Sequence, residues 1–197
     1  MNLTGLHPLI LASTSKYRAS LLRQLGYQFT TAAPTLNEDQ YKNLGHSPLE
    51  LSQILSRMKA REIFTLHADS CVIGSDQVCH HQGQILSKPQ TVERAVQQLM
   101  SMQGETHELI TSVTVISPTS EETFSNITKL TMRRLTKEEI IRYVAEDSPL
   151  DCAGSYKLES AGIKLFSKIE MDDHTSIIGL PLIQLTTTLQ NFGFPLY

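Results

Sequence analysis

The fold class of this chain is decided by the stretch Ser70-Cys71-Val72-Ile73-Gly74-Ser75-Asp76-Gln77. Its apolar and small residues predict a compact, buried β-strand that runs straight into an acidic residue. Open α/β sheets bind their ligands at the carboxyl ends of their strands, which is where Asp76 is expected to lie. We therefore interpret the stretch as one strand of an α/β sheet and Asp76 as a candidate active-site residue. The alternative is an aspartate in an ordinary turn.

The residues before this stretch alternate between strand-like and helix-like patterns. Short apolar runs predict strands, whereas apolar residues at helical spacing predict helices. The expected elements are strands at residues 8–12 and 27–33, a helix after Ser15 that ends at Gly26, a loop at 34–46, and a helix that opens with Ser47-Pro48-Leu49-Glu50. The serine and glutamate of that last tetrapeptide form the pattern of a capping box.

The residues after the stretch continue the alternation. The expected elements are a turn at Gly83, a helix over 92–102 that ends at Gly104, a hairpin of residues 107–117 and 123–132, a helix over 136–145, strands at 162–170 and 175–178, and a closing helix over 181–191. No internal repeat, low-complexity tract or linker interrupts this order. The order predicts a mixed α/β fold in which residues 1–197 form a single domain.

The charge of the chain limits its possible partners. Of its 197 residues, 17 are Lys or Arg and 20 are Asp or Glu, so the formal net charge is -3. Such a chain has no broad basic surface for extended nucleic acid or for an anionic membrane. An anionic ligand would have to be held by a few local lysines and arginines. The expected partner is therefore a small phosphorylated molecule.

The cysteines and the amino terminus indicate a reducing compartment. Cys71, Cys79 and Cys152 form an odd set without CxxC spacing, which is typical of free thiols. No apolar stretch approaches the roughly 20 residues that span a bilayer, and residues 1–8 lack the pattern of a signal peptide. The sequence predicts a cytoplasmic protein that does not enter a membrane.

The common nucleotide-binding motifs GxxxxGK[ST] and GxGxxG are missing from the sequence, so a phosphate site would need another cradle. Ser13 and Ser15 lie where a predicted strand meets the start of a helix, and hydroxyls and free amides at such a place can hold a phosphate. Arg18, one turn along, can bind the same phosphate with two hydrogen bonds. These residues fit a capped surface helix equally well, and both interpretations stay open.

Other charged residues extend the candidate site around Asp76. Glu38 in the long loop offers a second carboxylate, and Mg²⁺ commonly takes one or two carboxylates together with phosphate oxygens and water. Lys59 and Lys88 can neutralise a triphosphate, although isolated lysines are usually surface charge and most loop glutamates are only solvated. The run Cys79-His80-His81 contains metal-binding residue types, but histidines next to a predicted turn are more often exposed polar residues, so we leave it out.

Six fragments of the chain resemble, in the same order, the motifs of the Maf family of nucleotide pyrophosphatases. They are Ser13-Thr14-Ser15-Lys16-Tyr17-Arg18 with Leu21-Leu22, then Lys59-Ala60, Gly74-Ser75-Asp76-Gln77, Lys88-Pro89, Asp151-Cys152-Ala153-Gly154-Ser155, and Gly179-Leu180-Pro181-Leu182. Each fragment is weak alone, but together they span nearly the whole chain. The resemblance implies an inosine-triphosphatase-like α/β fold with a mixed sheet, flanking helices and two lobes around a central cleft, often as a homodimer.

The resemblance also implies roles for individual residues. The corresponding positions are Asp76 for the catalytic aspartate, Glu38 for the loop glutamate, Lys59 and Lys88 for the two lysines, and Ser13, Ser15 and Arg18 for phosphate binding. Asp76 and Glu38 are the implied ligands of a divalent cation, Mg²⁺ or Mn²⁺. The chain departs from the family at Asn37, where an aspartate is frequent, so Glu38 is the acidic group at the expected place, with Asp39 adjacent.

Three positions resemble the branch of the family that acts on 7-methyl-GTP. The branch that acts on dTTP and UTP tends to have Thr after the catalytic aspartate and Gln in the later Gly-rich segment, whereas this chain has Gln77 and Glu159. Tyr17 stands where the 7-methyl-GTP branch usually has Trp; it is still aromatic but offers a weaker cation–π surface. The resemblance implies that Tyr17, Gln77 and Glu159 bind the substrate.

The leading functional hypothesis is hydrolysis of 7-methyl-GTP to 7-methyl-GMP and pyrophosphate, a reaction that removes non-standard nucleotides. A second hypothesis keeps the chemistry but takes dTTP, UTP or another nucleotide as substrate. A third is a nucleotide-binding regulator of septum formation without significant turnover. The carboxylates and lysines of the implied site argue against the third hypothesis, because a sensor does not need a metal-activated water.

Overall fold

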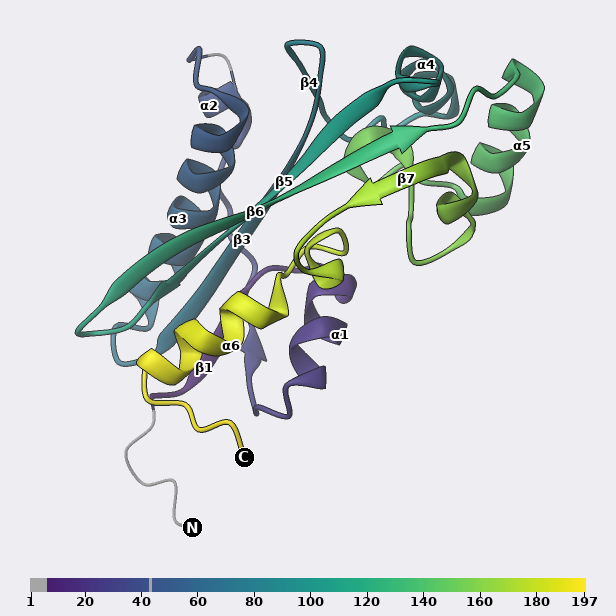
Figure 1. Cartoon of the computed structure of the whole chain (residues 1–197). Helices are drawn as coiled ribbons and strands as arrows, with labels where there is room; N and C mark the ends of the chain where they lie inside the picture. Colours follow the sequence, from purple (N-terminus) through teal and green to yellow (C-terminus); the bar gives the residue numbers. More distant parts are fainter. Residues whose placement is uncertain (1–6, 43) are drawn as a thin grey trace. The chain divides into compact units, whose positions relative to one another are not determined.

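The computed structural model of the chain describes residues 7–42 and 44–197 (Figure 1). The fold is mixed α/β, as the sequence predicts, with helices flanking a seven-stranded sheet. The chain divides into two compact units, of which the first comprises Met1–Asp76, Thr111–Asn126 and Asp173–Tyr197 and the second comprises Gln77–Ile110 and Ile127–Asp172. Strands β3, β5 and β6 contribute residues to both units. That residues 1–197 form a single domain stays a prediction.

The first unit contains a sheet with the strand order β2-β1-β3-β5-β6, in which β1 is parallel to β2 and to β3. Its strands are β1 (Leu9–Ala12), β2 (Thr30–Thr31) and the first-unit parts of β3 (Cys71–His81), β5 (Thr106–Ile116) and β6 (Glu121–Met132). Its helices are α1 (Lys16–Gln24), α2 (Asp39–Lys42), α3 (Pro48–Leu66), the 3-10 helix η3 (His174–Ser176) and α6 (Leu182–Asn191).

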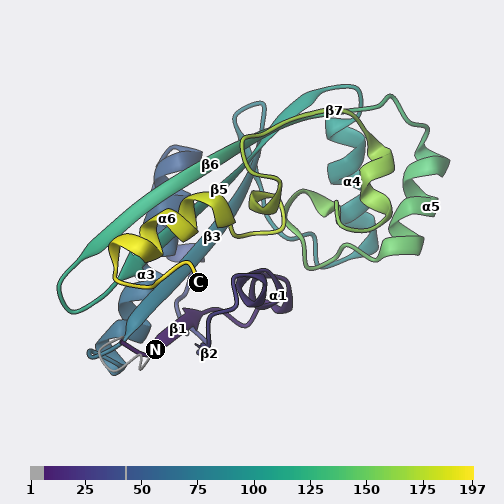
Figure 2. The same cartoon turned by 60° about the horizontal axis from the view of Figure 1, so that its bottom comes forward.

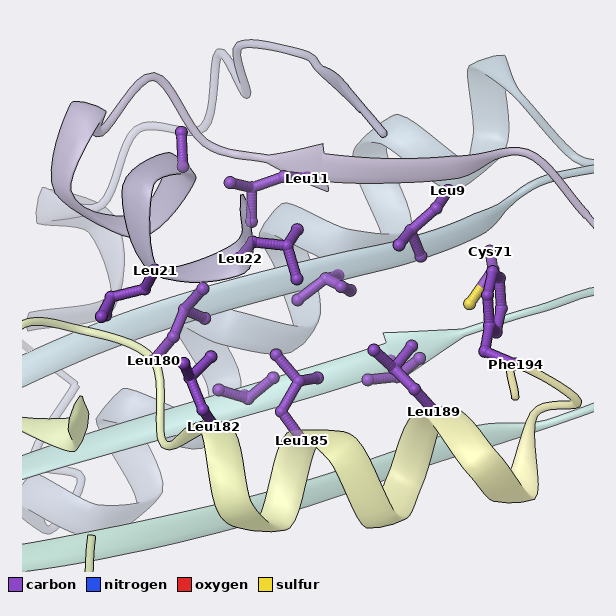
Figure 3. Packing of buried hydrophobic residues seen from close by; sticks show 14 residues of the cluster. Leu9, Leu11, Leu21, Leu22, Cys71, Leu180, Leu182, Leu185, Leu189 and Phe194 are labelled. Atoms are coloured by element: carbon purple, nitrogen blue, oxygen red, sulfur yellow. The ribbon is translucent and has the colours of Figure 1, made fainter. Parts of the chain in front are cut away.

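Side chains of β1 alternate between two helical layers, because successive residues of a strand point to opposite faces of the sheet. Leu9 and Leu11 pack with leucines of α1 and α6 in one buried cluster, and Figure 3 shows these side chains facing one another. Ile10 and Ala12 pack on the other face in a cluster that includes residues of α3. Strand β1 is therefore buried on both sides, which explains its continuous apolar sequence.

Strand β3 and helix α3 approach each other closely at Gly74. A Cβ atom at this position would lie 2.3 Å from the carbonyl oxygen of Ser56 and 2.7 Å from the amide nitrogen of Ala60. No residue larger than glycine fits without moving the helix. The close approach brings the turn of α3 that carries Lys59 against the strand that carries Asp76.

The second unit contains two helices that pack against each other, α4 (Val92–Met102) and α5 (Lys137–Asp147), as both cartoon views show (Figures 1 and 2). Its other elements are β4 (Gln84–Leu86), η1 (Ala153–Ser155), η2 (Ala161–Leu165), β7 (Phe166–Glu170) and the second-unit parts of β3, β5 and β6. β4 is antiparallel to β3, and β7 is antiparallel to β6. The rings of His107, Tyr156 and Phe166 form a buried cluster between these elements.

The predicted helices are present, and their starts were the most predictable feature of the fold. The predicted capping box forms between Ser47 and Glu50 at the start of α3, and Thr136 forms another with Glu139 at the start of α5. The predicted hairpin is also confirmed, since β5 and β6 are neighbours in the sheet. In the part of the chain that the structure describes, no helix combines the length and the apolar composition needed to cross a membrane.

Several predicted strands and loops need correction. The strand predicted over 27–33 is limited to Thr30–Thr31, and the predicted loop 34–46 contains the short helix α2. The first half of the strand predicted at 162–170 is the 3-10 helix η2, and β7 begins only at Phe166. The strand predicted at 175–178 is wrong, because the carboxylate of Asp173 accepts hydrogen bonds from the amide and hydroxyl of Thr175 and closes a turn there.

Candidate active site

Asp76 lies inside β3 and not at its carboxyl end, which corrects the expectation from the sequence. β1 and β3 pair only as far as Ala12 and Gly74, whereas β3 continues to His81. Asp76 therefore lies just beyond the end of the neighbouring parallel strand β1. Its side chain is buried. The strand end next to Asp76 is that of β1, whose pairing with β3 stops at Gly74.

The ammonium group of Lys59 lies between two carboxylates. Its Nζ is 2.6 Å from Oδ1 of Asp76 and 2.6 Å from Oε1 of Glu38. The Lys59 side chain is only 12% exposed, and that of Asp76 only 8%. Two carboxylates at such a short distance from each other would repel, and the shared cation offsets that repulsion. The structure thus brings together three of the predicted site residues.

The electrostatic surroundings of Asp76 favour a basic carboxylate. Burial raises the pKa of Asp76, because a site poor in water disfavours the charged form. The positive charges of Lys59 and Arg18 oppose that rise, and the negative charge of Glu38 adds to it. A carboxylate whose pKa is raised by burial and whose ionised form is held by a lysine is suited to accept a proton.

Ser13 and Ser15 form the turn between β1 and α1. The amide of Ser15 donates to Oγ of Ser13 over 3.1 Å, and the amide of Arg18 donates to Oγ of Ser15 over 3.3 Å. Ser15 is therefore the N-cap of α1, as the simpler interpretation of the sequence expects. In each bond the serine oxygen accepts, so its hydroxyl hydrogen can still be donated to an anion. Phosphate binding by these serines stays a prediction.

The guanidinium group of Arg18 binds two backbone carbonyl groups, one of them in the residue directly before Asp76. Its Nη1 donates to the carbonyl oxygen of Ser75 over 2.9 Å, and its Nε donates to that of Gly179 over 3.2 Å. Burial lowers the pKa of Arg18, although Asp76 and Glu38 oppose this effect. An arginine still remains charged at neutral pH. Because Nε and Nη1 already donate to backbone carbonyls, the bidentate binding of phosphate expected from the sequence would have to use the remaining N–H groups of Arg18.

The loop before α6 has a supporting role that the sequence analysis missed. Gly179 has a φ of 122°, and a Cβ atom there would lie 3.0 Å from Nε of Arg18, so glycine permits the contact with Arg18. Asp173 is buried, and its carboxylate accepts hydrogen bonds from the amides of Thr175 and Ile183. These bonds fix the loop that presents Gly179. The available signal was an aspartate two residues before a threonine, a pattern typical of a local turn.

Four further predicted site residues are Tyr17, in the first unit, and Gln77, Lys88 and Glu159, in the second unit. Tyr17 is half-buried on α1, and Nζ of Lys16 lies 5.1 Å from the centre of its ring. The remaining three are in the second unit: Gln77 follows Asp76 on β3, Lys88 is exposed between β4 and α4, and Glu159 is exposed after η1. Their roles in substrate binding stay predictions.

The assignment of Cys79-His80-His81 as exposed residues is wrong. Cys79 and His81 are buried, and His80 is half-buried. The reason is that β3 extends further than the sequence indicates: residues Cys79 to His81 pair with β4, and the turn begins only at Gln82. The sequence pattern predicts a strand that ends near Asp76, whereas β3 continues to His81 and buries these residues.

The carboxylates of Asp76 and Glu38 suit a divalent cation as part of its ligand set. Each has an oxygen 2.6 Å from the same Lys59 nitrogen, so the two groups lie close together on the ammonium, and a divalent cation would have to bind to lone pairs that the ammonium does not use. Mg²⁺ needs only one or two carboxylates when phosphate oxygens and water complete its shell. Within the described residues, no group of three or more His, Cys, Asp or Glu could form a cage for a metal ion. The donor set therefore fits a cation that is shared with a phosphorylated substrate.

Comparisons with known proteins agree with the order of motifs in the sequence. The family model described as Maf-like protein matches residues 8–192. A protein of Bdellovibrio bacteriovorus named 7-methyl-GTP pyrophosphatase is 47% identical over 183 residues, which are 93% of this chain and 96% of the relative. A protein of Syntrophotalea carbinolica with the same name is 41% identical over 188 residues, or 94% of each chain. The solved structure of a HAM1 protein from Coxiella burnetii is similar at 11% identity over 94% of this chain and all of that chain, with a TM-score of 0.46 that is too low to establish a shared fold. The match over residues 8–192 and the identity to these relatives show that the chain belongs to the Maf-like protein family.

Proposed function

We propose that the protein is a nucleotide pyrophosphatase that hydrolyses 7-methyl-GTP to 7-methyl-GMP and pyrophosphate. Two relatives that are 47% and 41% identical to this chain are named 7-methyl-GTP pyrophosphatase. The observation that carries the proposal is the Lys59 nitrogen, which lies 2.6 Å from both Asp76 and Glu38. Cleavage of a phosphoanhydride needs a base, a place for a cation and positive charge next to the phosphates, and this cluster offers all three.

In the proposed reaction, a water oxygen attacks the α-phosphorus of the triphosphate. A bond forms between that oxygen and the α-phosphorus, and the bond from the α-phosphorus to the oxygen bridging to the β-phosphate breaks. Pyrophosphate leaves with the electron pair of the broken bond, and Asp76 accepts the proton of the water. In the protein without a bound cation, burial raises the pKa of Asp76, so its carboxylate is more basic than that of an exposed aspartate.

Asp76 and Glu38 would hold a divalent cation, Mg²⁺ or Mn²⁺, which when bound would neutralise phosphate charge and make the attacking water more acidic. Lys59 keeps the two carboxylates close together, and its ammonium adds a fixed positive charge beside the phosphates. Ser13, Ser15 and the free amides at the start of α1 are proposed to bind phosphate oxygens. Lys88 is proposed to neutralise a further part of the triphosphate charge.

Glu159 is proposed to recognise the guanine base. The Watson–Crick edge of guanine presents two donors, N1–H and the N2 amino group, and an ionised carboxylate can accept both hydrogen bonds. Methylation at N7 adds positive charge to the base, which favours a nearby carboxylate and an aromatic face such as that of Tyr17. Gln77, the residue after Asp76, is proposed as a further substrate contact.

The test is a comparison of 7-methyl-GTP, GTP, dTTP and UTP in the presence of Mg²⁺ or Mn²⁺, with phosphate measured by malachite green. We expect phosphate to appear only when inorganic pyrophosphatase is added, the highest kcat/KM with 7-methyl-GTP, and no turnover in excess EDTA. Phosphate release without the coupling enzyme would contradict the reaction. A kcat/KM for dTTP equal to that for 7-methyl-GTP would contradict the substrate, and nucleotide binding without any turnover would favour a regulator.

The cellular location and the assembly of the protein stay predictions of the sequence and of the family resemblance. We expect a cytoplasmic enzyme that forms a homodimer. Sedimentation velocity of the purified chain over a range of concentrations would test the dimer.

A further inference from the structure

The side chain of Gln98, on α4, joins two loops of the second unit. Its Nε2 donates a hydrogen bond to the carbonyl oxygen of Ser87 over 2.8 Å, and its Oε1 accepts one from the hydroxyl of Ser155. The orientation of the amide is fixed by chemistry, because the carbonyl of Ser87 can only accept a hydrogen bond. One half-buried side chain thus connects the loop before α4 with helix η1.

Each of these loops leads to a residue with a proposed role in substrate binding. Lys88 directly follows Ser87, and Ser155 begins the segment that ends at Glu159. The loops also have a direct connection between their backbones, since the amide of Gln90 donates to the carbonyl oxygen of Leu150 over 3.1 Å. The proposed triphosphate contact and the proposed base contact therefore lie on two loops that are bonded to each other.

Both loops contain a residue in an unfavourable backbone conformation. The φ angle is 64° at Gln90 and 63° at Ser155, in the left-handed region that residues other than glycine rarely adopt. Such a conformation persists only where neighbouring contacts hold it, and residues of this kind are frequent at functional sites. Ser155 is fully buried, and its hydroxyl bond to Gln98 is one of the contacts that hold it.

The chain between Ser155 and Glu159 is anchored at further points. The ring of Tyr156 is buried, and the amide of Lys157 donates to the hydroxyl of Tyr143 over 2.9 Å. Nζ of Lys157 donates to the carbonyl oxygen of Asp147 over 2.9 Å. The position of Glu159 therefore follows from a short anchored segment, and Gln98 holds the beginning of that segment.

We propose that Gln98 is a positioning residue that holds both the loop of Lys88 and the segment of Glu159 on α4, so that one of its hydrogen bonds supports triphosphate binding and the other supports base selectivity. The proposal rests on the proposed function, since it assumes that Lys88 and Glu159 contact the nucleotide. Gln98 itself does not touch the substrate in this proposal. Its two hydrogen bonds act on the two loops separately, so they can be removed separately.

Two substitutions separate the two hydrogen bonds. Gln98→Met keeps the length of the side chain but removes both bonds, whereas Gln98→Glu keeps an acceptor for Ser155 and loses the donor to Ser87. For Gln98→Met we expect KM for 7-methyl-GTP to rise about 5- to 10-fold and the preference over dTTP to fall by a similar factor, as for the loss of one hydrogen bond per loop. For Gln98→Glu we expect the rise in KM with the preference retained. Gln97→Met, an exposed neighbour on the same helix, is the matched control.

The preference is a ratio of two kcat/KM values, so it does not depend on how much of a variant is folded. Hydrogen–deuterium exchange should show faster exchange at residues 87–91 in both variants, and at 153–159 in Gln98→Met only. If Gln98→Met keeps the preference and the exchange rates of the wild type, the proposal is overturned while the proposed function stands. If the wild type turns over no nucleotide, the proposed function fails, and unchanged exchange in Gln98→Met would then separately overturn the positioning role.

Discussion

Lys59 and Asp76 form an ion pair of 2.6 Å although both side chains are nearly buried. Loss of one partner from a buried ion pair destabilises a protein, because the other charge is left buried without a counter-charge. This ion pair lies just beyond Gly74, where β1 stops pairing with β3. The same Lys59 nitrogen binds Glu38, so the three groups respond to one another. The chemistry proposed for the site depends on the charge of Asp76 and not on its size.

The first prediction concerns Asp76→Asn, which keeps the shape of the side chain and removes its charge. We expect kcat to fall by at least about 100-fold, the usual effect of losing a general base. The melting temperature should change little, because Lys59 keeps Glu38 as a partner. Asp69→Asn, at an exposed aspartate before β3, is the control and should keep wild-type turnover. Wild-type kcat in Asp76→Asn would show that Asp76 is only a structural residue.

The second prediction concerns Arg18, which holds two backbone carbonyls next to the site. Arg18→Lys keeps the charge but cannot reach both Ser75 and Gly179 with the planar fork of a guanidinium group. We expect the free energy of unfolding to fall by about 1 to 3 kcal/mol, the cost of losing hydrogen bonds to a charged group. Urea unfolding measures this change, and Arg23→Lys, at the exposed end of α1, serves as the control.

A direct phosphate contact by Arg18 would give a different result from the second prediction. If Arg18 bound the triphosphate without supporting the backbone, Arg18→Lys would raise KM and leave the free energy of unfolding unchanged. The two measurements on one variant therefore distinguish a supporting role from the substrate-binding role that the sequence predicts.

The third prediction concerns His107, which is fully buried beside Tyr156 and Phe166. Burial, with a smaller effect of His81, lowers the pKa of His107 from 6.5 to about 4. The unfolded chain therefore takes up a proton on this histidine at a higher pH than the folded chain. The contribution to stability is complete above pH 6.5, is lost as the pH falls toward 4, and amounts to about 3 kcal/mol in total.

The measurement for His107 is urea unfolding at several pH values between 7.5 and 4. His107→Asn should show a smaller loss of stability over this range than the wild type, because no imidazole is left to titrate. His67→Gln, at an exposed position after α3, should keep the pH dependence of the wild type. An identical pH dependence in wild type and His107→Asn would mean that His107 is not the group responsible.

Local sequence patterns predicted the helices of this protein but not the ends of its strands. The start of α3 could be predicted because Ser47 and Glu50 bond to each other within one turn. The length of β3 could not, because it depends on pairing with β1 on one part and with β4 on another. The hydrogen-bond partners of Arg18 could not be predicted either, since Gly179 is 161 residues away in the sequence.

The composition of the candidate site was predicted better than its supports. Asp76, Glu38 and Lys59 are candidates from their place in the sequence and from the family resemblance, and the structure brings them together. Asp173 was missed because a buried carboxylate that binds only backbone amides and a neighbouring hydroxyl has no motif beyond its own turn. Residues that support a site through backbone hydrogen bonds can be identified in a structure, but a single sequence gives almost no signal for them.

The last prediction concerns Glu159, on which the selectivity for the base is proposed to depend. Glu159→Gln keeps the length of the side chain but replaces one acceptor oxygen by a donor. A glutamine facing the two donors of guanine leaves one of them without an acceptor, whereas thymine and uracil present carbonyl groups that a glutamine amide can serve. We expect the preference for 7-methyl-GTP over dTTP to fall by about 1 to 3 kcal/mol, or roughly 5- to 150-fold in the ratio of kcat/KM values.

Glu170→Gln, an exposed glutamate of the same unit on β7, is the matched control for Glu159→Gln and should leave that ratio unchanged. Tyr17→Ala provides a second measurement, because Tyr17 is proposed to face the positive charge of the methylated base. The ring already interacts with one cation, since Nζ of Lys16 lies 5.1 Å from its centre. Affinity for 7-methyl-GTP should fall more than affinity for GTP in this variant. If Glu159→Gln keeps the wild-type ratio while Tyr17→Ala lowers it, the methyl group is recognised by the ring and the guanine edge is read by another residue.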